Sequence, residues 1–244
     1  MLGAAMAVLL VAAVLVAGRG MLGYGRDVAR AGARAVVQLA AVALVITWVV
    51  HALWSTALFV LVMFTVAVRT AGRRITDEPG WSWAWAAAPI AGGVLPVLVL
   101  LLGSGLLPAK GLSVVPVAGI LIGGALSATS LAGRRALDEL TQRHGEVEAA
   151  LALGFEDREA RLEICRTAAA TSLVPALDQT RTVGLVTLPG AFVGMLLGGS
   201  SPVAAGAVQL FVLVALLAVE AVAIVVVLEL VGRGLVRRPV QWRR

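Results

Sequence analysis

Few polar side chains in this 244-residue sequence stand where they could do chemical work. Glu148 opens a Glu-Ala-Ala triplet with Ala149 and Ala150, and Gly154 follows after three residues. Glu220 interrupts a long apolar run, where a central charge costs about 2.5–3.5 kcal/mol on insertion scales. An acid kept there despite that cost suggests a role. These groups allow protein contact, ion pairing and proton exchange rather than covalent catalysis.

Several other kinds of chemistry are not supported. Two histidines and the single Cys165 provide no cluster with the ligand spacing of a soft metal, so a metal site stays unknown. No inward group of His, Asp and nucleophile indicates an enzyme. A phosphate-binding loop needs Gly-Lys-Ser/Thr, but the only lysine, Lys110, follows Ala109. We therefore expect this chain to bind no cofactor, and ATP and Mg to be handled by a separate protein.

Composition indicates an integral membrane protein. The chain is 60% hydrophobic and 14% charged, and its apolar residues form long runs separated by short charged clusters. A soluble core of this size cannot bury such runs, so lipid must solvate them. The net charge of +6 could suggest nucleic-acid binding, but basic loops of a membrane protein explain it without a nucleic acid.

The apolar runs predict an all-α, polytopic membrane protein with about seven transmembrane helices. Roughly 20 apolar residues are needed to cross the hydrocarbon core as a helix. We expect the spans at Leu2–Ala17, Ala35–Val50, Trp54–Val68, Trp85–Leu107, Val114–Ala132, Val183–Leu197 and Val203–Val231.

The basic residues predict the orientation of these spans. Of the 20 lysines and arginines, only Lys110 falls outside four segments that seven spans place on one side. These segments are Gly18–Arg34, Arg69–Gly80, Gly133–Thr182 and Gly232–Arg244. Because inside loops collect basic residues, we expect the N-terminus outside, the C-terminus in the cytoplasm, and a multi-pass protein of the plasma or inner membrane.

The segment 133–182 is too long for a simple connection, and its pattern is helical. Val147 and Leu151 share one helical face, whereas Leu162, Cys165 and Ala169 share another. Gly154 lies between them and can adopt the left-handed conformation that ends a helix. Acids at 156, 157 and 159 suit the first turn of the second helix, and Pro175 is expected to close it.

The spacing of Glu148, Ala149, Ala150 and Gly154 resembles the cytoplasmic "EAA" loop of ABC-transporter permeases, in which a short helix docks into a separate ATPase. The small alanines would allow close approach, and Glu148 would offer a charged contact. The alternative is an amphipathic hairpin on the membrane surface. On the first interpretation, residues 133–182 form a cytoplasmic coupling loop between helices five and six.

Glycines and a few polar groups mark a possible translocation path. Glycines four residues apart, such as Gly119 with Gly123 and Gly190 with Gly194, give a smooth helix face for close packing. Ordinary helix packing is the first explanation, and the functional interpretation is that the Pro189-interrupted sixth span lines the path. Arg34 and Gln38 share a face at the inner end of span two. Glu220 could be protonated, paired across helices or part of an ion path. Glu229, near the inner end of the last span, is expected to be solvated, and Asp178 and Arg181 are expected to form a local ion pair.

Four stretches together resemble the Fet-type iron-export permeases, a family that includes a plant aluminium-tolerance membrane protein. They are Arg34–Leu39, Val115–Ile120, Leu151–Gly154, and Val183–Gly190 continuing through Gly198–Pro202. The resemblance covers nearly the whole chain. It implies that residues 1–244 form a single ABC permease transmembrane domain working as a homodimer with two copies of a cytosolic ATPase, linked to metal export.

One departure from that family bears on the substrate. Where the family usually has two methionines after the Pro-Gly pair, this chain has Ala191 and Phe192, although Met195 remains nearby. If those methionines contact metal, the substrate here differs. The alternative function is a secondary transporter that uses Glu220 as a proton or cation carrier.

Overall fold

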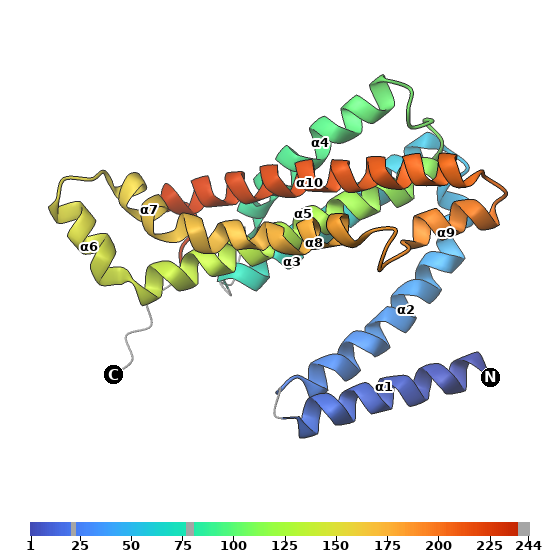
Figure 1. The fold of residues 1–244 in the computed structure, drawn as a ribbon, viewed down its shortest axis with the longest axis horizontal. Helices are drawn as coiled ribbons and strands as arrows, with labels where there is room; N and C mark the ends of the chain where they lie inside the picture. Colours follow the sequence, from blue (N-terminus) through green and yellow to red (C-terminus); the bar gives the residue numbers. More distant parts are fainter. Residues whose placement is uncertain (21–22, 77–80, 239–244) are drawn as a thin grey trace. The chain divides into compact units, whose positions relative to one another are not determined.

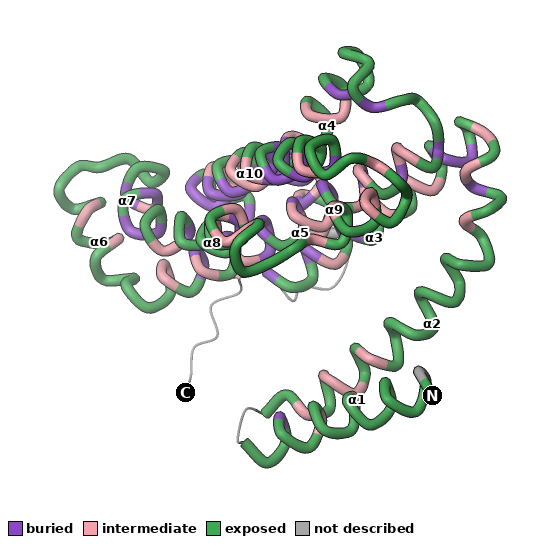
Figure 2. The backbone as a smooth tube through the Cα atoms, turned by 45° about the vertical axis from the view of Figure 1, so that its right-hand side comes forward, coloured by how far each residue is buried: buried purple, intermediate pink, exposed green. Residues whose placement is uncertain are grey.

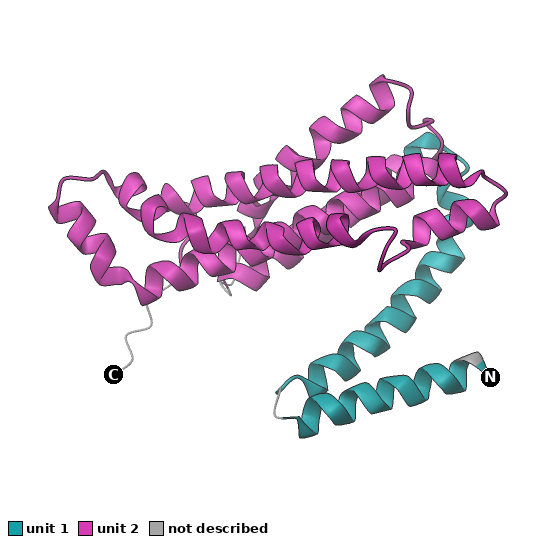
Figure 3. Ribbon diagram, in the orientation of Figure 1, with its two compact units in different colours: residues 1–55 teal, residues 56–244 magenta. Residues whose placement is uncertain are grey.

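A computed structural model describes residues 1–20, 23–76 and 81–238 of the chain. The described residues are helical throughout apart from turns and one isolated bridge between Val183 and Thr187. The chain divides into two compact units, residues 1–55 and 56–244 (Figure 3). The parts of the expected basic segments at 77–80 and 239–244 lie outside the described residues.

The first unit is a pair of packed helices. Helix α1 (Leu2–Arg19) and α2 (Gly25–Val49) meet at Gly32, where a Cβ atom would lie 2.5 Å from a methyl carbon of Leu10. The chain leaves α2 through a short turn, across which Trp48 and Trp54 pack edge to face with ring centroids 5.3 Å apart. A pair of indoles in this geometry stabilises the turn, as aromatic pairs do elsewhere.

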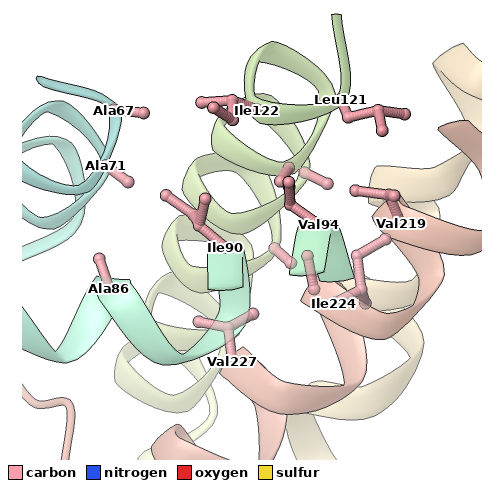
Figure 4. Close-up of a cluster of buried hydrophobic side chains, with 14 of the residues drawn as sticks. Ala67, Ala71, Ala86, Ile90, Val94, Leu121, Ile122, Val219, Ile224 and Val227 are labelled. Atoms are coloured by element: carbon pink, nitrogen blue, oxygen red, sulfur yellow. The ribbon is translucent and has the colours of Figure 1, made fainter. Parts of the chain in front are cut away.

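The second unit is a helical bundle. It contains most of α3 (Leu53–Thr76), the 3-10 turn η1 (Trp81–Ala86), α4 (Ala87–Gly103), α5 (Gly111–Gln142) and α10 (Pro202–Gly232). Their facing side chains form one buried apolar core, in which Ile90 and Val94 of α4 lie between α5 and α10 (Figure 4). Alanines at 118, 125, 128, 132 and 136 make the inner face of α5. Small residues let neighbouring backbones approach closely, which is how helices associate in lipid.

Three long helices of this unit run in the same direction. Gly119 of α5 lies against Met63 of α3, and Gly133 lies against Ile75. Beyond α10, Arg238 donates hydrogen bonds to Asp138 of α5 and to the carbonyl of Ile75. The C-terminal ends of α3, α5 and α10 therefore meet at one end of the bundle, called here the α6 end because α5 continues there into α6 (Figure 1).

Short helices connect α5 to α10. Helix α6 (His144–Ala152) is followed by α7 (Asp157–Ala170), the 3-10 turn η2 (Thr171–Leu173), α8 (Val174–Thr182) and α9 (Gly190–Leu197). Pro175 lies in the first turn of α8, where a missing N–H costs nothing, and so it begins a helix rather than closing one. The expectation for Pro175 was wrong because the 3-10 turn, not the proline, ends α7.

Five of the described helices are long and apolar enough to cross a membrane: α2, α3, α5, α10 and the stretch Trp83–Gly103. The shorter apolar segment Gly3–Arg19 corresponds to the first expected span. The sixth expected span, Val183–Leu197, is not one helix, because residues 183–189 are non-helical and α9 has eight residues. Eight residues rise only about 12 Å, less than half the hydrocarbon thickness.

Candidate functional site

Helix α6 carries the Glu-Ala-Ala triplet at the tip of the second unit. It has no buried residue, and Figure 2 shows it mostly exposed, whereas the neighbouring α7 has a buried face. Glu148 is 69% exposed, with its Oε1 atom 3.4 Å from Nδ1 of His144 one turn earlier. Ala149 is exposed and Ala150 half-buried. The triplet thus lies on an open helix that another protein can reach.

Gly154 makes the turn that ends α6. Its φ of +92° lies in the left-handed region, and nothing approaches within 4 Å of a Cβ atom placed there. Its N–H donates to the carbonyl of Leu151 at 3.0 Å, while the N–H of Phe155 donates to that of Ala150 at 3.1 Å. This pair of bonds is the Schellman motif, which satisfies the last carbonyls of a helix. The expected helix-glycine-helix arrangement is confirmed.

Unlike α6, helix α7 is anchored in the bundle. Its buried face comprises Ala160, Leu162, Ile164, Cys165 and Ala169, which pack against α5 and α10. Leu162 lies against Gly232, where a Cβ atom would be 2.8 Å from the leucine Cγ. One short turn therefore connects α6 to a helix that contacts two long helices of the bundle.

Polar contacts strengthen this anchoring. Arg158 of α7 donates two parallel hydrogen bonds to the carboxylate of Glu229 on α10, at 2.8 and 2.7 Å. Arg233 contacts the same carboxylate at 2.6 Å. Arg135 of α5 donates to Thr171 of η2 at 2.6 Å. Bidentate arginine–carboxylate pairs fix geometry as well as adding energy.

Exposed ion pairs also join α5 to α6. Arg143 lies between the two helices and bonds Glu139 at 3.1 Å and Glu146 at 2.7 Å. The hydrogen bond from Arg143 lowers the pKa of the Glu146 carboxyl, and the two acids raise that of Arg143. Exposed pairs of this kind contribute little to stability. They connect the last turn of α5 to the first turn of α6.

Glu220 lies against the backbone of α5. A Cβ atom on Gly124 would be 2.9 Å from Oε1 of Glu220 and 2.6 Å from a methyl carbon of Leu216. The glycine therefore makes the room that the carboxyl group occupies. Glu220 is half-buried, and within the part of the chain that the structure describes it forms no ion pair.

Other polar groups are buried in the part of the core that the structure describes. The side-chain oxygens of Thr129, Ser130 and Gln209 are buried without a hydrogen-bond partner. Among residues 1–20, 23–76 and 81–238, no three His, Cys, Asp or Glu side chains lie close enough to hold a metal ion.

The remaining predicted path residues are spread over both units. Arg34 and Gln38 lie one turn apart on α2, exposed within the first unit. Pro189 lies immediately before α9. This helix contains Gly190, Gly194 and the half-buried Met195. No heavy atom comes within 4 Å of a Cβ atom placed at Gly123, Gly190 or Gly194. Their role in a path stays a prediction.

Sequence reasoning missed the residues that make the closest contacts. Gly124, and not its neighbour Gly123, faces α10, and Gly93 of α4 lies against the carbonyl oxygen of Val219. Arg158 was not singled out, and Glu229, expected to be solvated, is held by two arginines. The spacing of Gly124, Ala128 and Ala132 could have identified Gly124 as a contact residue. These residues are four apart, so they share the face of α5 that contacts neighbouring helices.

The fold and this arrangement define a multi-pass helical membrane protein with an exposed short helix coupled to its bundle. The family described as "Uncharacterised protein family (UPF0014)" matches residues 1–236, and the chain belongs to that family. No solved structure matches the chain.

Named relatives come from plants and bacteria. The chain is 33% identical to "UPF0014 membrane protein STAR2" of Oryza sativa subsp. japonica, over 79% of this chain and 68% of the relative. It is 36% identical to "Protein ALUMINUM SENSITIVE 3" of Arabidopsis thaliana, over 63% of this chain but only 56% of that protein. It is 28% identical to "Probable iron export permease protein FetB" of Escherichia coli strain K12, over 92% and 87%.

Proposed function

We propose that this chain is the membrane-spanning permease subunit of an ABC transporter that exports metal ions, with iron as the first candidate substrate. A separate cytosolic ATPase hydrolyses ATP, and two copies of the chain form the path. The name of the Escherichia coli relative, which includes iron export, supports the substrate. Ala191 and Phe192, which stand in place of the methionine pair usual in Fet-type permeases, leave room for another metal.

The observation that carries this proposal is the contrast between α6 and α7. Helix α6 is open to a partner over its whole length, whereas α7, five residues away, is packed against α5 and α10. A partner that grips α6 acts on the bundle through the Gly154 turn. An amphipathic hairpin lying on the membrane surface would present an apolar face along α6, but Leu151 is the only large apolar side chain that is exposed within the described helix, 144–152.

The proposed orientation places the α6 end in the cytoplasm. In the second unit, the basic residues of α3, α5, α7 and the segment after α10 gather at this end, since the C-terminal ends of these long helices meet there. Basic residues are retained on the cytoplasmic side of membrane proteins. An ATP-hydrolysing subunit in the cytosol can therefore reach α6.

Replacing Gly154 by proline tests the coupling. Proline fixes φ near −65° and has no N–H, so it can adopt neither the +92° conformation nor the bond to Leu151. The strain of forcing proline into this turn, about 1–2 kcal/mol, lowers the population of the native turn by a factor of about five to thirty. We expect the tagged G154P chain to reach the membrane, yet to retain an ATP-binding subunit and stimulate its ATP hydrolysis at least fivefold less well.

Gly105 provides a matched control. It also has a positive φ, +74°, and donates its N–H to a carbonyl, that of Leu102, but it lies in the turn before α5. The 32 residues of α5 separate this turn from α6 by about 48 Å. G105P should lose similar stability while keeping the ATPase coupled. Equal coupling in the two variants would refute the role of the Gly154 turn.

Secondary transport is the second candidate, and Glu220 is the observation that favours it. A half-buried acid set against Gly124 can exchange a proton or bind a cation. The two candidates differ in energy source: ATP-driven flux that continues after Glu220→Gln excludes the carrier mechanism, whereas flux that follows an ion gradient and ends with this substitution excludes the ABC mechanism.

A further inference from the structure

A groove opens between α7, η2 and α10 on the second unit. Its volume is about 430 Å³, within the range of sites for small ligands. Its lining combines apolar side chains with three charged residues, Arg158, Arg166 and Glu229. The apolar lining consists of Leu162, Ala170, Leu173, Ala221, Ile224, Val225 and Leu228.

The charged residues of the groove carry a surplus of positive charge. Glu229 is held by Arg158 at 2.7 Å and by Arg233 at 2.6 Å, so its negative charge is already compensated. Arg166 follows Arg158 by eight residues on α7. It is exposed and makes no ion pair in the described part of the chain. Of the acids on α7, neither Glu159 nor Glu163 lines the groove. The groove therefore favours an anion beside an apolar group.

The position of the groove along α10 adds a second constraint. Its apolar lining follows the helix from Ala221 to Leu228, and the charges begin one residue later at Glu229. In a membrane-spanning helix, such a change marks the boundary between hydrocarbon and headgroups. Ala170 and Leu173, which line the same groove as Ala221, then lie at hydrocarbon depth, so on this placement the end of α7 and η2 are not part of a cytoplasmic loop, contrary to the expectation for residues 133–182. A ligand that fits both parts has an acyl chain and a phosphate joined at that boundary.

We propose that this groove binds one anionic phospholipid from the bilayer, with its phosphate on Arg166 and Arg158 and its acyl chain along Ala170 and Ala221. Basic pockets between membrane helices bind anionic headgroups in this way. The inference needs only that the chain spans a membrane, and it holds whether or not the protein couples to an ATPase. A bound lipid would brace α7 against α10, the contact through which movement of α6 reaches the bundle.

Native mass spectrometry of the detergent-solubilised full chain tests this site. The probes are phosphatidylglycerol, phosphatidylcholine with the same acyl chains, and inorganic phosphate. We expect the wild-type chain to retain one phosphatidylglycerol in preference to phosphatidylcholine, and phosphate not to displace it. R166Q should weaken phosphatidylglycerol retention roughly fivefold, the effect of about one basic residue at an anionic surface.

Two further variants separate the site from general charge and from folding. R134Q removes an exposed arginine of α5 that does not line the groove, so retention should stay within twofold of wild type. A170F leaves the charge unchanged and fills the apolar part of the groove from an exposed position, so both lipids should be lost. Protection of the buried Cys165 from labelling shows that each variant is folded.

Three outcomes would overturn the proposal. Equal effects of R166Q and R134Q would mean that lipid is attracted by the general charge of this end. Retention unaffected by A170F would mean that no acyl chain enters the groove. Loss of a dimer in R166Q and A170F, with lipid retention unchanged, would assign the groove to a second copy of the chain.

Discussion

The contact between α4 and α10 provides the sharpest test of the packing. A Cβ atom on Gly93 would lie 2.6 Å from the carbonyl oxygen of Val219 and 3.2 Å from its Cγ1. A backbone oxygen cannot rotate away, so Gly93→Ala must displace α10 or α4. Overpacking of this kind costs about 1–3 kcal/mol.

The adjacent Gly92 makes a matched control in the same helix. A Cβ atom there would meet only Val226 Cγ2 at 3.8 Å, an ordinary contact. Both substitutions gain the same helix propensity, about 0.5–1 kcal/mol, so the difference between the two variants isolates the packing cost. For a unit of this size, 1–3 kcal/mol corresponds to a melting temperature roughly 2–12 °C lower in G93A than in G92A.

Thermal unfolding in detergent or lipid measures this difference. Cys165 is the only cysteine of the chain and is buried, so a thiol-reactive fluorophore reports its exposure on unfolding without any added label site. The expected order of stability is G92A above G93A. Melting temperatures within about 1 °C of each other would show that α4 and α10 do not approach as closely as Gly93 and Val219 indicate.

Two other predictions concern single groups. On the proposed function, Glu220→Gln should leave ATP-driven flux within about threefold of wild type, measured as metal efflux from proteoliposomes that contain the ATPase; loss of more than tenfold with ATP hydrolysis intact would count against it. Burial raises the pKa of the Cys165 thiol from 9.0 to about 11, so the stability from the neutral thiol is present below pH 9 and is lost as the pH rises toward 11. A water-soluble maleimide at pH 7 should leave the folded chain unlabelled, and rapid labelling would contradict this burial.

Local features of the fold were predicted from sequence where neighbouring residues decide them. The α6–Gly154–α7 unit is one case, because a glycine followed by acids specifies both the end of one helix and the start of the next. The Asp178–Arg181 pair, with a separation of 3.6 Å, was likewise expected. These features depend on residues within about two helical turns of each other, whose geometry an α-helix fixes.

Two other features of the fold were not predicted. Val183–Leu197 is apolar enough to suggest a span, but residues 183–189 turn back with a bridge between Val183 and Thr187. Glu229 looked solvated because its partner Arg158 is 71 residues earlier in the chain. The first outcome depends on a local turn and the second on how helices pack, and hydropathy describes neither.

The sequence by itself determined that this protein is an integral membrane protein, since only lipid can solvate its long apolar runs. It also determined the exposed helix and its glycine turn, since backbone conformation there is a local property. Only the tertiary structure decided that Gly124 and Gly93, rather than the adjacent Gly123 and Gly92, make the close contacts with α10. It also decided that a groove forms beside Arg166. Such contacts depend on the rotation of each helix about its axis, which is set jointly by all the helices packed against it.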